Sequence, residues 1–340
     1  MQLKRCLKIV LFYIILTGLG FATGGQKYIH LGDFNLENGE VIRECKIGYR
    51  TFGKVNQDSS NVILYPTWFG GTSEHIKNLI KNGHIVDSTK YFIIATDALG
   101  NGVSSSPSNS KLQPAFQFPE FSIHDMVQTQ YQLLNELGFD HIFGIVGGSM
   151  GSFQAFEWLV TYPAFIEKAV PYVCTPKLTA PDKLWMKFQL EIVELGLENN
   201  CSEAQIQKIL DIYSNMSGRT PQYFLENMPG EQFYQFYNKF DSRTDDRFTL
   251  ENRASQIKAM LSHDITRNFN GSLQQAVDEI QAEIFMIVSE TDHLVNPALS
   301  HKLAKISDAE IMTLRSNCGH LAVGCALDTC TQAISDFLHR

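Results

Sequence analysis

Hydrophobic positions along this chain follow two periods, that of β-strands and that of α-helices. Short apolar runs predict strands at residues 28–36, 41–52, 61–65, 91–96, 141–146, 168–173, 284–288 and 310–314. Apolar residues at helical spacing predict helices at residues 123–137, 153–160, 297–306 and 326–337. This alternation predicts an α/β fold: a mostly parallel sheet flanked by helices, with its ligand site at the carboxyl ends of the strands.

Residues 175–277 interrupt the alternation, because they contain no strand-like run. Helical segments rich in Gln, Glu, Met and aromatic residues are expected at 183–195, 202–216, 221–227, 231–240 and 250–263. A helical insertion after a strand of an α/β sheet is typical of a lid. The sequence therefore predicts a core in two parts, 25–174 and 278–340, with a helical lid at 175–277. The lid aromatics fit a substrate pocket and a small lid core equally well.

The first 24 residues differ from the rest of the chain. Three basic residues, Lys4, Arg5 and Lys8, precede an apolar run at 9–16 and then small residues around 18–25. This order predicts a secretory signal peptide at 1–24 and an exported protein, periplasmic or secreted. The run is shorter than the roughly 20 residues of a membrane span. An uncleaved membrane anchor is the alternative, and after cleavage no stable span is expected.

The net charge of the chain indicates which classes of partner to expect. The formal net charge is −8, and removal of the three N-terminal basic residues would make it −11. An acidic protein without a basic stripe repels phosphate backbones, so a nucleic-acid partner is not expected. A small-molecule ester or thioester is the expected partner. The oligomeric state stays open, with a homodimer as one option.

Six of the seven cysteines lie after the predicted signal peptide: Cys45, Cys174, Cys201, Cys318, Cys325 and Cys330. An even number in an exported protein permits disulfides, in many different pairings. A large core does not need them, so free and partly buried thiols are the simpler expectation. The three C-terminal cysteines lack zinc-type spacing, and no other metal constellation appears. No metal and no bound cofactor are therefore expected.

The sequence Gly-Gly-Ser-Met-Gly, residues 147–151, lies between a predicted strand and a predicted helix. A tight turn at that place presents Ser149 at its apex, near the positive end of the helix dipole. Gly147 and Gly151 would let strand and helix pass without a Cβ clash. An ordinary glycine-rich turn is the competing interpretation.

A serine nucleophile needs a base, and the base needs a carboxylate that holds one tautomer. Asp292 and His320 each follow a predicted strand, so both belong at the same sheet edge as Ser149. Ser149, Asp292 and His320 are therefore the predicted catalytic residues. Glu290 is the alternative acid and His293 the alternative base.

Acyl transfer also needs hydrogen-bond donors for the developing oxyanion. One donor is expected to be the backbone N–H of Met150, which follows the nucleophile. The second is expected from the loop after strand 61–65, at Trp68 or Phe69. The competing interpretation is that this loop is only a tight connection.

Several segments carry a resemblance to a known family. They are residues 147–151, the Gln-Ala-Phe-Glu-Trp at 154–158, Tyr162-Pro163, the strand at 91–94 with Leu99-Gly100, and Cys318-Gly319-His320. Together they resemble the homoserine O-acetyltransferase family of the α/β-hydrolase superfamily. The likeness covers nearly all of residues 28–340 and is weakest in the lid. It implies the α/β-hydrolase fold, with Ser149, Asp292 and His320 as nucleophile, acid and base. It also implies transfer of an acyl group from acetyl-CoA or a similar thioester to an amino-acid hydroxyl.

Two departures from that family change the expected reaction. Residues 67–71 read Thr-Trp-Phe-Gly-Gly, where the family usually has Ala-Leu-Thr-Gly. The lid lacks the family's Gly-Leu-x-x-Ala-Arg pattern, and Arg253 precedes an alanine without that context. The chain thus resembles a divergent, often exported branch, and thioester cofactors are scarce outside the cytoplasm. A carboxylic-ester hydrolase is expected, with an acyl-CoA-dependent O-acyltransferase and a non-catalytic binding protein as alternatives.

Overall fold

The computed structural model describes residues 24–80, 83–242 and 247–340. The predicted signal peptide, residues 1–24, lies outside the described residues except for Gly24. Within the described ranges, no helix has both the length and the apolar composition that a membrane span requires.

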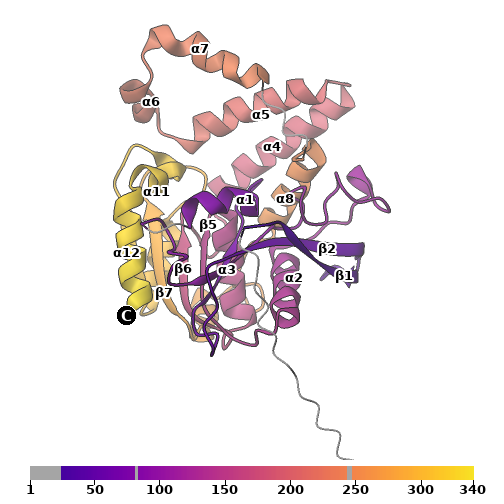
Figure 1. Cartoon of the computed structure of the whole chain (residues 1–340). Helices are drawn as coiled ribbons and strands as arrows, with labels where there is room; N and C mark the ends of the chain where they lie inside the picture. The colour runs from indigo at the N-terminus through magenta and orange to yellow at the C-terminus, as the bar shows by residue number, and fades with distance from the viewer. Residues whose placement is uncertain (1–23, 81–82, 243–246) are drawn as a thin grey trace, which may run out of the picture.

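One sheet organises the fold, and its strand order is β1-β2-β4-β3-β5-β6-β7-β8 (Figure 1). The strands are β1 Lys27–Asn35, β2 Val41–Phe52, β3 Val62–Pro66, β4 Phe92–Thr96, β5 Ile142–Gly148, β6 Ile166–Tyr172, β7 Glu283–Ser289 and β8 Glu310–Leu314. The β1–β2 and β2–β4 pairs are antiparallel, and all other neighbours are parallel. The predicted mostly parallel sheet is confirmed.

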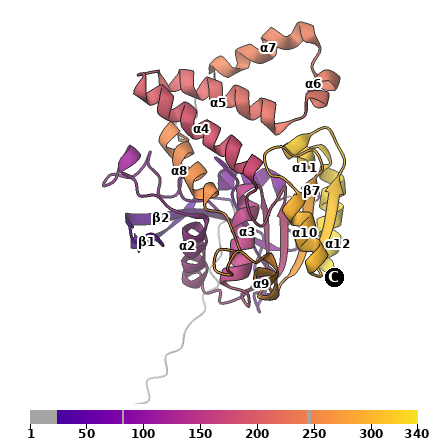
Figure 2. The same cartoon turned by 180° about the vertical axis from the view of Figure 1, so that it is seen from behind.

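Both faces of the sheet are apolar and both are covered by helices. In β3, Val62 and Leu64 belong to one core cluster, whereas Ile63 and Tyr65 belong to another, because successive side chains point to opposite faces. The first cluster is completed by α2 Ile123–Glu136, α3 Met150–Thr161, α9 Leu273–Asp278 and α10 Ala298–Ile306. The second is completed by α1 Ser73–Ile76, α11 Ala322–Cys325 and α12 Leu327–His339. Figure 2 shows α9 and α10 from behind.

Between β6 and β7 the described chain contains helices, turns and one isolated bridge, between Lys177 and Asp264, and no strand. Besides α9, its helices are α4 Ala180–Glu198, α5 Glu203–Gly218, α6 Pro221–Asn227, α7 Phe233–Tyr237 and α8 Leu250–Leu261. Both views show α5, α6 and α7 farthest from the sheet, with α4 and α8 reaching back to the core (Figures 1 and 2). Short 3-10 turns occur at Lys77–Leu79, Ala115–Gln117, Gly230–Gln232, Asn238–Ser242 and Gly319–Leu321.

A buried ion cluster ties the helices on one face together. The carboxylate of Glu157 in α3 accepts hydrogen bonds from Arg267 at 2.6 and 2.8 Å and contacts the His124 ring of α2 at 2.8 Å. Burial alone would raise the pKa of Glu157, but the bonds from His124 and Arg267 outweigh it and lower the pKa to about 2. The charged form of Glu157 is therefore part of the packed fold.

Candidate active site

Ser149 lies at the turn between β5 and α3 with φ 54° and ψ −125°, a backbone conformation that is strained for a residue with a side chain. A Cβ at Gly147 would lie 2.5 Å from the carbonyl oxygen of Gly151, and a Cβ at Gly151 would lie 2.7 Å from that of Pro66. Both contacts are closer than real Cβ atoms allow. The predicted strand–turn–helix with obligatory glycines is thus confirmed, and Gly151 is also needed beside the end of β3.

A continuous hydrogen-bonded relay joins three side chains from distant parts of the sequence. The Oγ of Ser149 lies 2.9 Å from Nε2 of His320, and Nδ1 of His320 lies 2.7 Å from Oδ2 of Asp292. The other oxygen of Asp292 accepts the backbone N–H groups of Leu294 at 2.8 Å and Val295 at 3.0 Å. Because the carboxylate can only accept, Nδ1 carries the proton and Nε2 is free to take one from Ser149.

The two partners of Ser149 in the relay are both largely buried. The side chain of Asp292 is 1% exposed and that of His320 is 12% exposed. The alternative residues are outside the relay, since Glu290 pairs with Arg315 at the surface and His293 is exposed. The sequence prediction therefore selected the three side chains that the fold brings together.

The loop that follows β3 lies beside the N-terminus of α3. Gly70 donates its N–H to Gln256 at 2.9 Å, and Gly71 donates to the carbonyl of Trp68 at 2.8 Å. Within the described ranges, no acceptor takes a hydrogen bond from the N–H groups of Met150, Trp68 or Phe69. These are the three groups predicted for the oxyanion, and the geometry keeps both Trp68 and Phe69 as candidates for the second donor.

Arg253, singled out in the sequence, supports this loop from α8. Its guanidinium stacks over the rings of Phe69 and Phe248, at 5.4 and 5.7 Å from their centroids, and donates to Gln189 at 2.8 Å. Burial lowers the pKa of Arg253 to about 10, against the opposing effect of Asp211. The side chain of Arg253 is thus occupied by its packing against Phe69 and Phe248 and its hydrogen bond to Gln189.

A pocket of about 640 Å³ opens at Ser149 and His320. Apolar side chains make most of its wall, among them Trp68, Phe69, Tyr172, Trp185, Met260 and Leu294. Of the lid aromatics proposed from the sequence, Trp185 lines this pocket, whereas Phe188 and Tyr213 pack against each other with ring centroids 4.5 Å apart. Both interpretations of the lid aromatics therefore hold, each for different residues.

The start of α4 anchors the loop that carries Asp292, a link that the sequence did not reveal. Trp185 donates its indole N–H to the carbonyl of Leu294 at 2.6 Å, and Asp182 accepts the N–H of Asn296 at 2.8 Å. Burial raises the pKa of Asp182, and the nearby Asp292 adds to the rise. The predicted helix began at residue 183, and the only local signal at Asp182 was its place three residues after Thr179, which is the spacing of an ordinary capping box.

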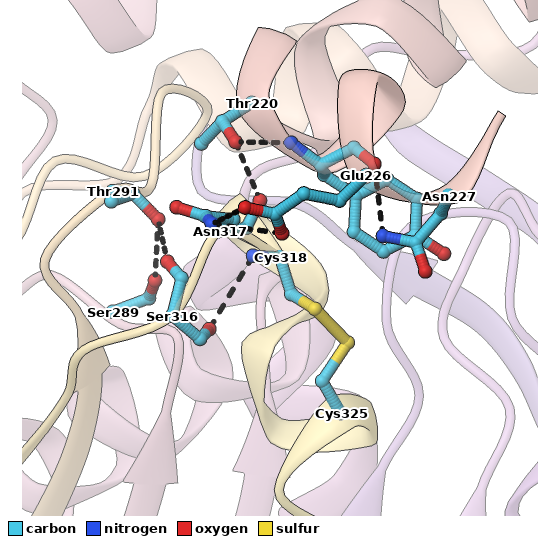
Figure 3. The surroundings of a disulfide bond; sticks show 10 residues. Thr220, Glu226, Asn227, Ser289, Thr291, Ser316, Asn317, Cys318 and Cys325 are labelled. Atoms are coloured by element: carbon cyan, nitrogen blue, oxygen red, sulfur yellow. Dashed lines mark hydrogen bonds between the residues drawn. A yellow bond between two sulfur atoms is a disulfide. The ribbon is translucent and has the colours of Figure 1, made fainter. Parts of the chain in front are cut away.

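Figure 3 shows a disulfide between Cys318 and Cys325, on either side of His320 in the sequence. The expectation of free thiols is wrong for this pair. It holds for Cys45, Cys174, Cys201 and Cys330, of which only Cys201 is exposed. Burial raises the pKa of Cys174 to about 12 and that of Cys330 to about 11, so neither thiol is a ready nucleophile.

Arg219, at the end of α5, is a second residue that the sequence did not single out. It lines the pocket, and its guanidinium lies over the ring of Tyr223 at 5.0 Å. No carboxylate of the described residues pairs with it. In the same part of the chain, no group of three or more His, Cys, Asp or Glu side chains is arranged to hold a metal ion.

The chain is similar to known esterases and to homoserine O-acetyltransferases. The model of the family described as alpha/beta hydrolase fold matches residues 61–324. The chain is 30% identical over 317 residues to an ethyl acetate hydrolase of Pseudomonas veronii, and the alignment covers 88% of this chain and 90% of that protein. It is 27% identical over 359 residues to a homoserine O-acetyltransferase of Nautilia profundicola, and that alignment covers 89% of this chain and 95% of the relative. The structure of an acetylester hydrolase from Corynebacterium glutamicum superposes with a TM-score of 0.83 at 26% identity, covering 93% and 95%.

Proposed function

The chain belongs to the α/β hydrolase fold family, and from that premise we propose that it hydrolyses carboxylic esters with Ser149 as its nucleophile. It is an enzyme related to esterases and to homoserine O-acetyltransferases, as its resemblance to the latter family implied. The observation that carries the finer proposal is the relay from Ser149 through His320 to Asp292 at an apolar pocket.

In the first step, Nε2 of His320 takes the proton of Ser149 while Oγ attacks the ester carbonyl. The carboxylate of Asp292 stabilises the imidazolium that forms, because it already accepts the Nδ1 proton at 2.7 Å. The backbone N–H of Met150, together with that of Trp68 or Phe69, stabilises the negative charge on the carbonyl oxygen. His320 then returns its proton to the leaving alcohol, and an acyl-enzyme remains.

In the second step, His320 activates a water molecule that attacks the acyl-enzyme and releases the acid. Three observations favour water as the acceptor of the acyl group. Relatives named ethyl acetate hydrolase and acetylester hydrolase align over most of the chain. The loop at residues 67–71 and the lid depart from the acetyltransferase pattern. The N-terminal segment has the order of an export signal, and acyl-CoA is scarce outside the cytoplasm.

Export, to the periplasm or the medium, is part of the proposal. The disulfide between Cys318 and Cys325 supports it, because disulfides persist in oxidising compartments and are rare in the cytosol. Fractionation of cells that express the full chain tests it. The mature protein should appear in the periplasm or medium with an N-terminus near residue 24, and an unprocessed protein retained with the cells would contradict export.

Two measurements test the hydrolase directly. A fluorophosphonate probe should label the wild type and fail to label Ser149→Ala. Chromogenic esters of graded acyl length should then show which chains fit the pocket of about 640 Å³. A Ser149→Ala variant that keeps its activity would refute the assignment of the nucleophile.

A second candidate function is O-acyl transfer from an acyl-CoA, which Arg219 favours. Its guanidinium faces the pocket without a carboxylate partner in the described chain, so a substrate carboxylate can supply one. An amino-acid acceptor such as homoserine has that group. Incubation with acetyl-CoA and homoserine decides between the two functions. Thiol release that requires homoserine would overturn the choice of water.

A further inference from the structure

We propose that the Cys318–Cys325 disulfide positions His320, so that full catalytic rate needs the oxidised bridge and kcat falls when a thiol reduces it. The catalytic part of this inference rests on the function proposed above. The bridge joins two residues seven positions apart (Figure 3). In the sequence, His320 lies between them, within the ring of chain that the bridge closes.

The chain around His320 has little regular structure of its own. His320 lies in the turn Gly319–Leu321, and the following α11, Ala322–Cys325, is only four residues long. Helical turns this short are not stable in isolation. Gly319 has φ +60°, and a Cβ there would lie 2.8 Å from the carbonyl oxygen of Gly218 in the lid. The position of His320 therefore depends on restraints from outside the segment.

Before the histidine, hydrogen bonds supply those restraints (Figure 3). Thr291 donates to the carbonyl of Ser316 at 2.7 Å, and Thr220 of the lid donates to the carbonyl of Asn317 at 2.7 Å. The side chain of Asn317 in turn donates to Glu226 at 3.1 Å. The chain is thus fixed to both the core and the lid just before it reaches the base.

After the histidine, such bonds are missing. Within the described chain, no hydrogen bond ties residues 321–325 to another element. Ala322 and Val323 are buried in the second core cluster, whereas Gly324 and Cys325 are exposed. Besides these two apolar contacts and the start of the core-packed α12 at Leu327, the disulfide restrains this side of the loop.

The same ring forms part of the pocket. Four of its residues besides His320 line the cavity at Ser149: Leu321, Val323, Gly324 and Cys325. Opening the ring would therefore displace both the base and the wall next to it. Because a displacement of about 1 Å can cost about 10²-fold in rate, reduction should act mainly on kcat.

The two bridged residues differ in exposure. Cys325 is exposed and Cys318 is 8% exposed, so the external thiolate is expected to attack at Cys325. The S–S bond breaks, a mixed disulfide forms at Cys325, and the Cys318 sulfur leaves as a thiolate that takes a proton. A second thiol then releases Cys325 as a thiol. Two external thiols are oxidised to one disulfide while the protein disulfide is reduced.

The test uses the full chain and ethyl acetate, an ester that thiols do not cleave readily, with released acid measured in a pH-stat. Reduction with dithiothreitol should expose two new thiols and lower kcat by about 10²-fold. Reoxidation with oxidised glutathione should restore it. The double variant Cys318→Ser/Cys325→Ser should have the low kcat at once and ignore the reductant. Cys201→Ser, which removes an exposed free thiol, should behave like the wild type.

Two further readouts separate positioning from a role in overall stability. Hydrogen exchange of residues 315–327 should rise on reduction while the rest of the chain and its circular dichroism stay unchanged. Full kcat after both thiols are titrated would overturn the inference, and so would global unfolding on reduction, because the bridge would then hold the fold. If the oxidised protein hydrolyses no ester but exchange still rises in this segment alone, the proposed function fails and the positioning of His320 stands.

Discussion

Replacement of Asp292 by asparagine tests the relay with almost no change in shape. The carboxylate accepts from His320 on one side and from two backbone N–H groups, those of Leu294 and Val295, on the other. An asparagine has one oxygen for these two sides. The paired backbone donors should hold that oxygen, so the NH₂ group faces Nδ1 of His320. Nδ1 must then accept, the ring proton moves to Nε2, and Nε2 no longer accepts from Ser149.

The size of the loss distinguishes this mechanism from a simple loss of charge. Loss of one charge-assisted hydrogen bond is worth about 1.5–3 kcal/mol, or about 10- to 150-fold in rate. The wrong tautomer removes the base itself and costs about 10⁴-fold in kcat, or about 5 kcal/mol. We therefore expect Asp292→Asn to lose about 10⁴-fold.

The assay is kcat and KM on a short-chain chromogenic ester, with circular dichroism to verify folding. Asp125→Asn is the matched control, because Asp125 is a buried carboxylate in the capping box of α2 that accepts from Ser122 and Glu37 and does not contact His320. It should lower the melting temperature and leave kcat within about threefold. A folded Asp292→Asn variant that loses less than 10²-fold would refute the tautomer argument.

Three further predictions concern the base, the turn and the ion cluster. His320→Ala should lower kcat by at least about 10³-fold, and a rate near that of the wild type would remove His320 from the mechanism. Gly147→Ala should destabilise the fold by about 1–3 kcal/mol in a denaturant titration, because its Cβ would lie 2.5 Å from a carbonyl oxygen, whereas Gly230→Ala, with open space around it, should not. Because the folded pKa of Glu157 is about 2, below its ordinary 4.5, its stabilisation is present above pH 4.5 and lost as the pH falls toward 2. Stability measured across that range should fall less steeply in Glu157→Gln, and equal slopes would contradict the role of this carboxylate.

The regular elements could be predicted because their signals are local. Alternating or continuous apolar runs marked the strands, and helical spacing marked α2, α3 and α12. Short helices such as α1 and α11 were not predicted, because four residues are too few to show a helical period. The boundaries shifted by a residue or two, as for β6, which begins at Ile166 rather than at residue 168.

The residues of the candidate site also differ in how much of their role a local sequence signal could predict. Ser149 could be predicted from its neighbours in the sequence, because two glycines at a junction of strand and helix are enough to indicate the turn. Asp292 and His320 were predicted because each follows a strand, with support from the family resemblance, and the parallel sheet brings such positions together at one edge. Two residues of the helical insertion between β6 and β7, Asp182 beside the loop of Asp292 and Arg219 in the pocket wall, gave no such signal, because their contacts depend on how that insertion packs on the core.

The sequence by itself determined a parallel sheet, a serine on a strained turn and the order of its three catalytic candidates, since each depends on neighbours within a few residues or on the strand count. Only the tertiary structure decided which cysteines pair, which lid residues reach the pocket and what fixes the loop of His320. Those facts depend on distances between segments that are far apart in the chain or joined by irregular loops. Such distances are set by packing of the whole fold, and no local pattern encodes them.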